Sequence, residues 1–257
     1  MTQTPQPGVM AITMAGMGSR FLKSGYDCPK YEIKVLGRHL FDWSMLGLMS
    51  FAEAGWRFRF AARADTGAVP FIEARCAEMG IRIDEILEID HLTNGQATTA
   101  FMLSEQAKAS APFAVFNIDT FVAPGNLNPE LAAKWCGWIP CFPAPGDGWS
   151  FARTDAAGRV VELREKQRIS EHATVGFYGF DSVARYNDCY RAYYADASRV
   201  EKSEYYIAPL YNQLIEDGLS VGIAQLSMDD VGMLGTPDQV EAFKTTPPKG
   251  AQPYVKL

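Results

Sequence analysis

The sequence predicts an α/β fold with a mostly parallel central sheet, flanking helices and a β-rich second half, and three observations support this. Through the first half, apolar strand-like runs alternate with helical stretches, which is typical of parallel strands joined by crossover helices. The first run, residues 9–14, leads into a glycine-rich turn. Beyond residue 137, several short β segments follow one another. The chain has 257 residues, 47% of them hydrophobic, which is enough for one large core.

The elements of the first half follow from hydrophobic periodicity and from turn residues. Residues 40–54 have helical spacing, with Phe41, Met45 and Leu48 on one face. Residues 69–79 are expected to form a helix that ends at Gly80, because glycine suits the left-handed position after a helix. The other expected elements are strands at 9–14, 57–62, 81–89 and 112–118 and a helix at 96–108.

The second half is expected to contain short strands joined by tight turns, with a few helices between them. Asp155-Ala156-Ala157-Gly158 has the composition of a hairpin turn, and Pro237 suits the first position of a helix at 237–243. The tail from Thr245 onward contains three prolines and is expected to wrap round the domain as an arm. The remaining expected elements are strands at 138–144, 149–154, 160–165, 174–180 and 220–226 and helices at 182–195 and 203–217.

Composition excludes several classes of protein. The net charge is −6 and no run of Lys and Arg occurs, so we expect no nucleic-acid partner. Residues 1–8 have no basic region and do not resemble a signal peptide. The longest apolar stretch, 40–51, is too short to span a bilayer, so we expect a cytoplasmic protein without a membrane partner. The five cysteines have no C-x-x-C spacing, which indicates reduced thiols rather than a zinc site.

The turn after the first strand has the features of a phosphate-binding loop. Its sequence is Ala15-Gly16-Met17-Gly18-Ser19-Arg20. Glycine tolerates positive φ and lets a ligand approach the backbone, and successive N–H groups in such a turn suit phosphate. Arg20 and, further on, Lys30 add positive charge, which predicts a nucleoside triphosphate site. The loop is neither a Walker A motif nor a dinucleotide fingerprint, because Phe21 stands where the latter has its third glycine.

A second polar group follows another buried strand. Phe116-Asn117-Ile118-Asp119 places a carboxylate at the end of the strand predicted at 112–118. The carboxyl ends of parallel strands lie at one edge of the sheet, where ligands bind, so Asp119 and the glycine-rich loop are expected in one crevice. Mg²⁺ is held by oxygen ligands, often one or two carboxylates together with substrate phosphates. We therefore expect Asp119 to bind Mg²⁺, the expected cofactor.

These residues resemble the signature of the sugar-phosphate nucleotidylyltransferases. The opening motif, residues 14–20 with Pro29-Lys30, carries most of the resemblance. Further segments fall in the order of the family: Gly95-Gln96-Ala97, Asn117-Ile118-Asp119, Glu165-Lys166 after Gly158-Arg159-Val160-Val161, Gly176-Phe177-Tyr178-Gly179-Phe180, and Gly235-Thr236-Pro237-Asp238. The likeness spans about residues 10–243, with no sharp boundary. It implies a single nucleotidyltransferase domain over 1–257, with a nucleotide-binding half at about 9–130, an acceptor-binding half at about 131–244 and a tail at 245–257.

The resemblance implies a reaction and a role for each matching residue. A phosphorylated small-molecule acceptor would attack the α-phosphorus of a nucleoside triphosphate and release pyrophosphate. Arg20 would hold the leaving β,γ-phosphates, Lys30 would contact the α-phosphate and Asp119 would ligate Mg²⁺. The implied nucleotide-binding residues are Met14, Ala15, Gly16, Gly18, Ser19, Gly95 and Gln96, and the acceptor-binding candidates are Glu165, Lys166, Gly176 and Glu204. Trp149, Tyr205 and Tyr206 either stack on the acceptor or belong to the core.

One position departs from the family. A second metal-binding Asp usually stands two residues before the Gly of the Gly-Thr-Pro turn, and here that position is Met233. Asp229 and Asp230 lie close by in the sequence, and Asp230 is taken as the candidate for the second metal ligand.

The acceptor is the least determined part of the expected function. A sugar 1-phosphate, activated for polysaccharide or glycan synthesis, is the first expectation. A close alternative is a CTP-dependent enzyme acting on a small phosphate or phosphonate such as phosphocholine. A non-catalytic nucleotide-binding regulator is a third reading, although it would be expected to lose Arg20, Lys30 or Asp119. A glycosyltransferase would want an Asp-x-Asp motif where this chain has Asn117-Ile118-Asp119. Assembly into a homo-oligomer stays open.

Overall fold

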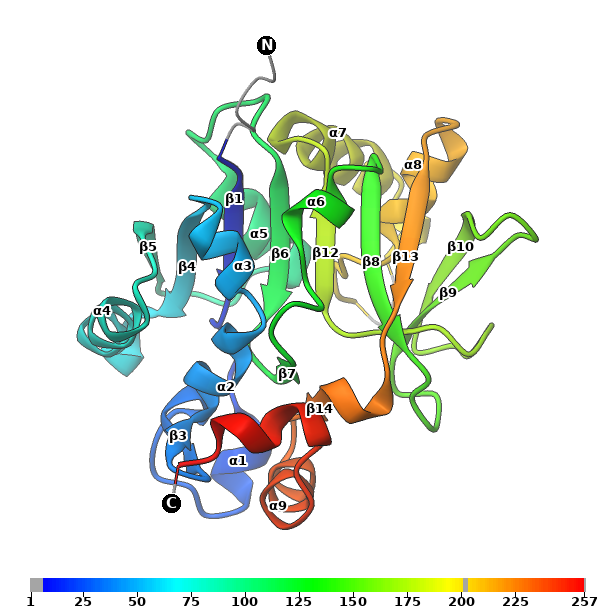
Figure 1. The fold of residues 1–257 in the computed structure, drawn as a ribbon. Helices are drawn as coiled ribbons and strands as arrows, with labels where there is room; N and C mark the ends of the chain where they lie inside the picture. The colour runs from blue at the N-terminus through cyan, green and yellow to red at the C-terminus, as the bar shows by residue number, and fades with distance from the viewer. Residues whose placement is uncertain (1–6, 201–202, 257) are drawn as a thin grey trace.

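One large sheet runs through both halves of the chain in the computed structural model, which describes residues 7–200 and 203–256 (Figure 1). Its strands are β1 (Val9–Thr13), β4 (Arg57–Arg63), β5 (Ile83–Ile89), β6 (Phe113–Asn117), β8 (Gly137–Phe142), β9 (Ser150–Thr154), β10 (Val160–Glu165), β11 (Ala173–Thr174), β12 (Phe177–Phe180) and β13 (Val221–Gln225). They lie in the order β10-β9-β11-β8-β12-β6-β1-β4-β5, and β13 pairs with β8. The neighbouring strands β5, β4, β1 and β6 are parallel. The neighbours along the row β6, β12, β8, β11, β9 and β10 pair antiparallel. The predicted α/β fold with a β-rich second half is confirmed.

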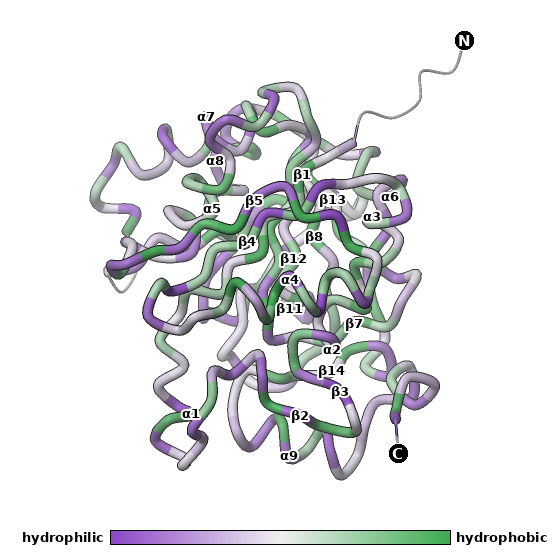
Figure 2. The backbone as a smooth tube through the Cα atoms, turned by 90° about the vertical axis from the view of Figure 1, so that its left-hand side faces the viewer, coloured by the Kyte–Doolittle hydropathy of each residue, from purple (hydrophilic) through white to green (hydrophobic). Residues whose placement is uncertain are grey.

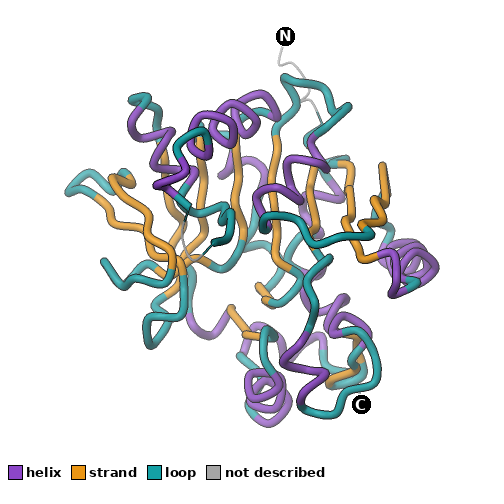
Figure 3. Tube along the Cα trace, turned by 180° about the vertical axis from the view of Figure 1, so that it is seen from behind, coloured by secondary structure: helices purple, strands orange, loops and turns teal. Residues whose placement is uncertain are grey.

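Helices cover both faces of this sheet. The helices are α1 (Ser19–Lys23), α2 (Leu40–Leu46), α3 (Met49–Glu53), α4 (Ala68–Met79), α5 (Gln96–Ser104), α6 (Pro129–Ala132), α7 (Val183–Tyr194), α8 (Leu210–Glu216) and α9 (Pro237–Thr245). Along β1, Met10 and Ile12 pack with α2, α3 and α4, while Val9 and Ala11 pack with α5, α7 and α8. Helices cross in front of the strands when the molecule is seen from behind (Figure 3). Because both faces are covered, hydrophobic segments follow the strands through the middle of the molecule (Figure 2).

A smaller lobe lies below the carboxyl ends of the parallel strands (Figure 1). It contains the hairpin β2 (Lys34–Val35) and β3 (Arg38–His39), the pair β7 (Thr120–Val122) and β14 (Val231–Met233), and helices α1 and α9 around a separate apolar cluster. The tail wraps over the hairpin as expected, since Lys256 N donates to Leu36 O at 3.1 Å and Arg38 Nε donates to Tyr254 O at 2.6 Å. No helix in the described ranges is long and apolar enough to cross a membrane.

Several element boundaries differ from the expectation, and two of the differences occur at glycines. The single helix expected at 40–54 is two helices, since the chain turns at Gly47, whose Cβ position would lie 2.8 Å from Val122 O. The strand expected at 174–180 is β11 and β12, separated at Gly176, which has φ +79°. The helix expected at 96–108 ends at Ser104, and the helix expected at 203–217 begins only at Leu210.

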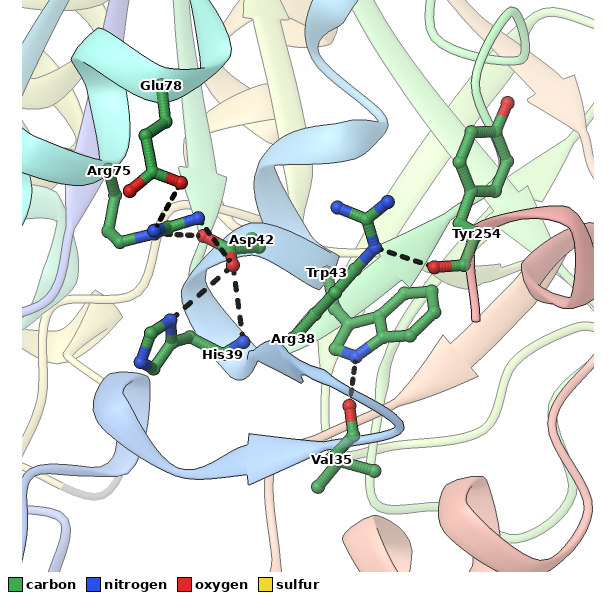
Figure 4. Close-up of polar contacts among 8 residues, drawn as sticks. All are labelled: Val35, Arg38, His39, Asp42, Trp43, Arg75, Glu78 and Tyr254. Carbon is green, nitrogen blue, oxygen red and sulfur yellow. Dashed lines mark hydrogen bonds and ion pairs between the residues drawn. The ribbon is translucent and has the colours of Figure 1, made fainter. Parts of the chain in front are cut away.

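A buried ionic network fixes the hairpin and α2 against α4 (Figure 4). The Asp42 side chain is 3% exposed and receives two hydrogen bonds from Arg75, at 2.8 and 2.9 Å. Its carboxylate also accepts from the backbone N–H of His39, which completes a capping box at the start of α2. Burial is the main cause that lowers the pKa of His39, so its ring is held neutral beside this pair.

Replacing Asp42 by alanine is expected to reduce the free energy of unfolding by about 3 kcal/mol, because it removes the buried partner of Arg75 and leaves this largely buried charge with only an exposed one. Glu78 also pairs with Arg75, at 2.7 Å, but is 64% exposed. Glu78→Ala is therefore the matched control, with an expected loss below about 1 kcal/mol. Urea unfolding of both variants checks the difference, and equal losses would contradict a structural role for Asp42.

Candidate active site

Two adjoining cavities open at the carboxyl ends of β1, β4 and β6. The first cavity, about 930 Å³, is lined by the glycine-rich loop, Lys30, Arg63 and the segment 91–96. The second cavity, about 450 Å³, is lined mainly by residues of the second half, among them Glu165 and Lys166. Five residues line both cavities: Arg20, Gln96, Asn117, Asp119 and Glu204. The residues singled out in the two halves of the sequence therefore meet around one junction.

The glycine-rich loop lines the first cavity as its sequence suggests. Gly18 has φ +61° and is the residue before the five-residue helix α1. Phe21, at the position where a dinucleotide fingerprint has glycine, is 2% exposed and anchors α1 in the lower lobe. Arg20, the residue before this anchor, lines both cavities. Met14, Ala15, Gly16 and Gly18 also line the first cavity, whereas the described lining of both cavities leaves out Ser19.

Lys30 and Asp119 form an ion pair at the junction. Lys30 begins a short 3₁₀ helix (Lys30–Glu32) after Pro29, and its Nζ lies 3.3 Å from Asp119 Oδ2. The Lys30 side chain is 18% exposed and that of Asp119 is 35% exposed, so both groups remain open to the cavity. A lysine ammonium in this position can bind a phosphate instead of the carboxylate. The carboxylate can likewise bind a metal ion instead of the ammonium.

The structure places Asp230 away from Asp119. β14 pairs antiparallel with β7, with Met233 opposite Thr120, and Leu234 N donates to Asp119 O at 2.8 Å. Met233 therefore lines the second cavity near Asp119. Asp230 precedes β14, where its carbonyl accepts from Ala123 N at 2.8 Å, and it belongs to neither set of lining residues described above.

Asp119 fits a magnesium ion as one carboxylate of a site completed by phosphate oxygens. Its side chain is 35% exposed and lines the first cavity together with the glycine-rich loop. Within residues 7–200 and 203–256, no group of three or more His, Cys, Asp or Glu side chains is arranged to hold a metal. Asp229, the other acidic neighbour of Met233, instead pairs with Lys249 at 2.7 Å.

The segment Gly95–Gln96 connects the two cavities. The Gln96 amide donates to Thr13 Oγ1 at 2.8 Å and to Asn117 Oδ1, so its side chain joins the ends of β1 and β6. Gly95 has φ +143°, and a Cβ there would lie 2.6 Å from Tyr205 N. Glycine is needed at this position because the backbone of Tyr205 lies directly against it. The structure thus brings Gly95 next to Glu204, a residue predicted for the acceptor half.

The second cavity contains a buried carboxylate beside a lysine. The Glu165 side chain is 9% exposed and accepts a hydrogen bond from Ser150 Oγ. Lys166 Nζ lies 3.7 Å from Glu165 Oε1 and 3.1 Å from Tyr206 Oη. Burial is the main cause that raises the pKa of Tyr178, so its phenol stays protonated in the wall of this cavity.

Gly176 closes the second cavity beside Asn117. A Cβ at Gly176 would lie 2.8 Å from the Asn117 side chain, and Asn117 N donates to Gly176 O at 3.0 Å. Of the aromatic residues in question, Trp149 lines the second cavity, whereas the Tyr205 ring stacks on Tyr194 with centroids 4.0 Å apart. Trp149 therefore suits ligand contact, and Tyr205 belongs to the core.

Two further residues of the first cavity were missed by the sequence reasoning. Arg63 ends β4, one residue past the predicted strand, and its Nη1 lies 2.9 Å from Met17 Sδ. Its hydrogen bonds to Asp65 raise the pKa of Arg63 and lower that of Asp65. Arg63 could have been predicted as a site residue by extending the strand at 57–62 by one residue, because the carboxyl end of that strand lies at the same sheet edge as the glycine-rich loop. Cys28 also lines the cavity, and burial is the main cause that raises the pKa of its thiol.

Comparison with known proteins first defines the class. The fold resembles the inositol-1-phosphate CTP transferase from T. maritima, with a TM-score of 0.73, 13% identity and coverage of 98% of each chain. It also resembles UDP-glucose pyrophosphorylase from Acinetobacter baumanii, with a TM-score of 0.69, 14% identity and coverage of 97% of each chain. These likenesses show a nucleotidyltransferase fold. No family model and no curated protein matches the chain.

A closer likeness identifies the family. The nucleoside-diphosphate-sugar pyrophosphorylase from Vibrio cholerae RC9 is 33% identical, with a TM-score of 0.85, over 92% of this chain and 100% of that chain. The chain therefore belongs to the nucleotidyltransferase family of that pyrophosphorylase, and it is an enzyme of that type. The resemblance to sugar-phosphate nucleotidylyltransferases is confirmed.

Proposed function

We propose that this enzyme transfers a nucleoside monophosphate from a nucleoside triphosphate to a sugar 1-phosphate and releases pyrophosphate. The observation that supports this is the junction of the two cavities at Arg20 and Asp119, with Lys30 beside it and Lys166 across the second cavity. Two phosphorylated molecules, one in each cavity, would meet there with their phosphates side by side. The activated sugar would serve polysaccharide or glycan synthesis, and we propose that the enzyme works in the cytoplasm.

The chain's own residues would act by positioning and by neutralising charge. An oxygen of the acceptor phosphate forms a new bond to the α-phosphorus, and the bond from that phosphorus to the bridging oxygen of pyrophosphate breaks. The acceptor phosphate is already anionic, so no general base is needed. Lys30 would stabilise the α-phosphate in the transition state, Arg20 the leaving pyrophosphate and Lys166 the acceptor phosphate. Backbone groups of Ala15, Gly16 and Gly95 would receive the nucleotide.

Asp119 would hold Mg²⁺ at the junction. When bound, the ion would neutralise negative charge on the phosphates. If Asp119 held a metal ion, the Lys30 ammonium would be available to contact the α-phosphate.

A phosphorylated amine is a second candidate acceptor, with CTP as the donor, and the charges of the second cavity favour it. Its described lining has three carboxylates, Asp119, Glu165 and Glu204, against two cations, Arg20 and Lys166. With Asp119 assigned to the metal, Glu165 and Glu204 remain near the aromatic rings of Trp149, Tyr178 and Tyr206. Carboxylates together with aromatic faces attract an ammonium group.

Pyrophosphate release tests the proposal and separates the acceptors. The enzyme is incubated with Mg²⁺ and each of ATP, CTP, GTP, UTP and dTTP, against sugar 1-phosphates, phosphocholine and aminoethylphosphonate. Release with a sugar 1-phosphate supports the first proposal, and release with CTP and an amine supports the second. Nucleotide binding without release for any pair would favour a non-catalytic regulator instead.

A further inference from the structure

We propose that Tyr206 is a positioning residue that holds the Lys166 ammonium in place for the acceptor phosphate. The proposal rests on the function proposed above and adds a residue to it. Tyr206 lies in the segment 203–206, which the sequence predicted to be helical and which the structure shows as a non-helical segment between the two cavities.

Lys166 needs an orienting partner because only its backbone is fixed by the fold. It follows β10 in the left-handed region, with φ +51°, and its N–H donates to Trp149 O at 2.9 Å. The side chain beyond Cβ is 38% exposed and has several rotatable bonds, whose ordering costs entropy. The ammonium contacts Tyr206 twice, donating to Oη at 3.1 Å and lying 4.8 Å from the ring centroid. Glu165, at 3.7 Å, is a weaker contact.

Tyr206 is itself held by the nucleotide half of the molecule. Tyr205 N donates to Asn94 O at 2.8 Å, and Ala97 N donates to Tyr205 O at 2.9 Å. The Tyr205 ring stacks on Tyr194, and Tyr194 Oη donates to the carbonyl of Tyr206 at 2.5 Å. The backbone of the residue before the phenol is therefore bonded to the segment that contains Gly95 and Gln96, and the carbonyl of Tyr206 itself is bonded to α7.

This arrangement positions a cation of one half by contacts with the other half. Lys166 follows β10 in the second half, while the residue that orients it comes directly after Tyr205, whose backbone is bonded to Asn94 and Ala97 of the first half. The distance between the two reacting phosphates depends on how the two halves lie relative to each other, and an error of about 1 Å can cost two orders of magnitude in rate. A phenol held by contacts with the nucleotide half would help to fix the distance of the Lys166 ammonium from the bound nucleotide.

The variant Tyr206→Phe tests the role, because it keeps the ring contact and removes only Oη. With a productive substrate pair, the KM for the acceptor is expected to rise about tenfold, as for the loss of one hydrogen bond to a charged group. The KM for the nucleoside triphosphate is expected to change less than about twofold. The matched control is Tyr190→Phe, which removes a phenol that bonds Thr98 Oγ1 at 3.0 Å and whose ring packs against Tyr205, the residue before Tyr206. Equal shifts in both KM values, or none, would overturn the proposal.

A second measurement does not depend on turnover. Lysines are labelled with acetic anhydride, and inorganic phosphate is titrated as a probe that protects Lys166, with the 76% exposed Lys249 as internal reference. Half-protection of Lys166 is expected to need about tenfold more phosphate in Tyr206→Phe than in the wild type. An unchanged midpoint, or a wild-type Lys166 that phosphate fails to protect, would overturn the role of Tyr206. If the midpoint shifts while no substrate pair releases pyrophosphate, the proposed function fails and the positioning role stands.

Discussion

Lys30→Ala is expected to lower kcat by about 10²–10³-fold while the protein remains folded. The expected loss is that of one preorganised donor at a site where charge develops in the transition state. Lys30 is placed for this by Pro29 and the short 3₁₀ helix, and its ammonium already lies at the junction, 3.3 Å from Asp119. Its contribution to stability is small, because the side chain reaches into a cavity rather than into the core.

The measurement is steady-state pyrophosphate release with the productive substrate pair, together with thermal unfolding of each variant. Lys34→Ala is the matched control, since Lys34 is an exposed lysine four residues further along, in β2. It is expected to keep kcat within about twofold of the wild type. A Lys30→Ala enzyme with near-normal kcat, or one that is unfolded, would refute the assigned role.

Asp119→Ala is expected to abolish Mg²⁺-dependent turnover, with a loss of at least about 10³-fold. Met233 occupies the position where the resemblance implies a second metal-binding carboxylate, and Asp119 is the proposed metal ligand that lines both cavities. Removing it would leave the ion only phosphate oxygens and would leave Lys30 without its carboxylate.

Turnover is measured across a Mg²⁺ titration for Asp119→Ala and for Asp230→Ala. Asp230 bonds through its carbonyl to Ala123 and lies outside the described lining of both cavities. Its replacement is therefore expected to leave the half-saturating Mg²⁺ concentration within about twofold. Undiminished activity of Asp119→Ala would refute the metal assignment, and a large rise in the Mg²⁺ requirement of Asp230→Ala would restore Asp230 as a ligand.

The sequence was sufficient to predict that Arg20, Lys30 and Asp119 line one crevice. The reason is general: parallel strands end at the same edge of a sheet, so residues that follow β1 and β6 converge whatever the details of packing. The alternation of strands and helices predicted the parallel part of the sheet on the same grounds. The prolines of the tail predicted that it wraps round the domain, and hydrogen bonds with Leu36 and Arg38 hold it there.

The features that sequence reasoning missed depend on contacts between distant segments. Residues 203–206 have no local signal against a helix, but Tyr205 donates a hydrogen bond to Asn94 and accepts one from Ala97, and these bonds hold the segment in a non-helical conformation. The position of Asp230 depends on the register of β14 against β7, which brings Met233 rather than an aspartate to the junction. The break at Gly47 depends on the close approach of Val122 O.

The central claim is that the junction brings an acceptor phosphate to the α-phosphorus of a nucleoside triphosphate. It is tested most directly by ³¹P NMR of the reaction of the wild-type enzyme with the substrate pair that gives turnover. We predict equal amounts of pyrophosphate and of a product in which the acceptor phosphate is linked to the nucleoside monophosphate. Addition of pyrophosphate should regenerate the triphosphate. Formation of free nucleoside monophosphate, or of nucleoside diphosphate with inorganic phosphate, in place of the linked product would contradict the claim.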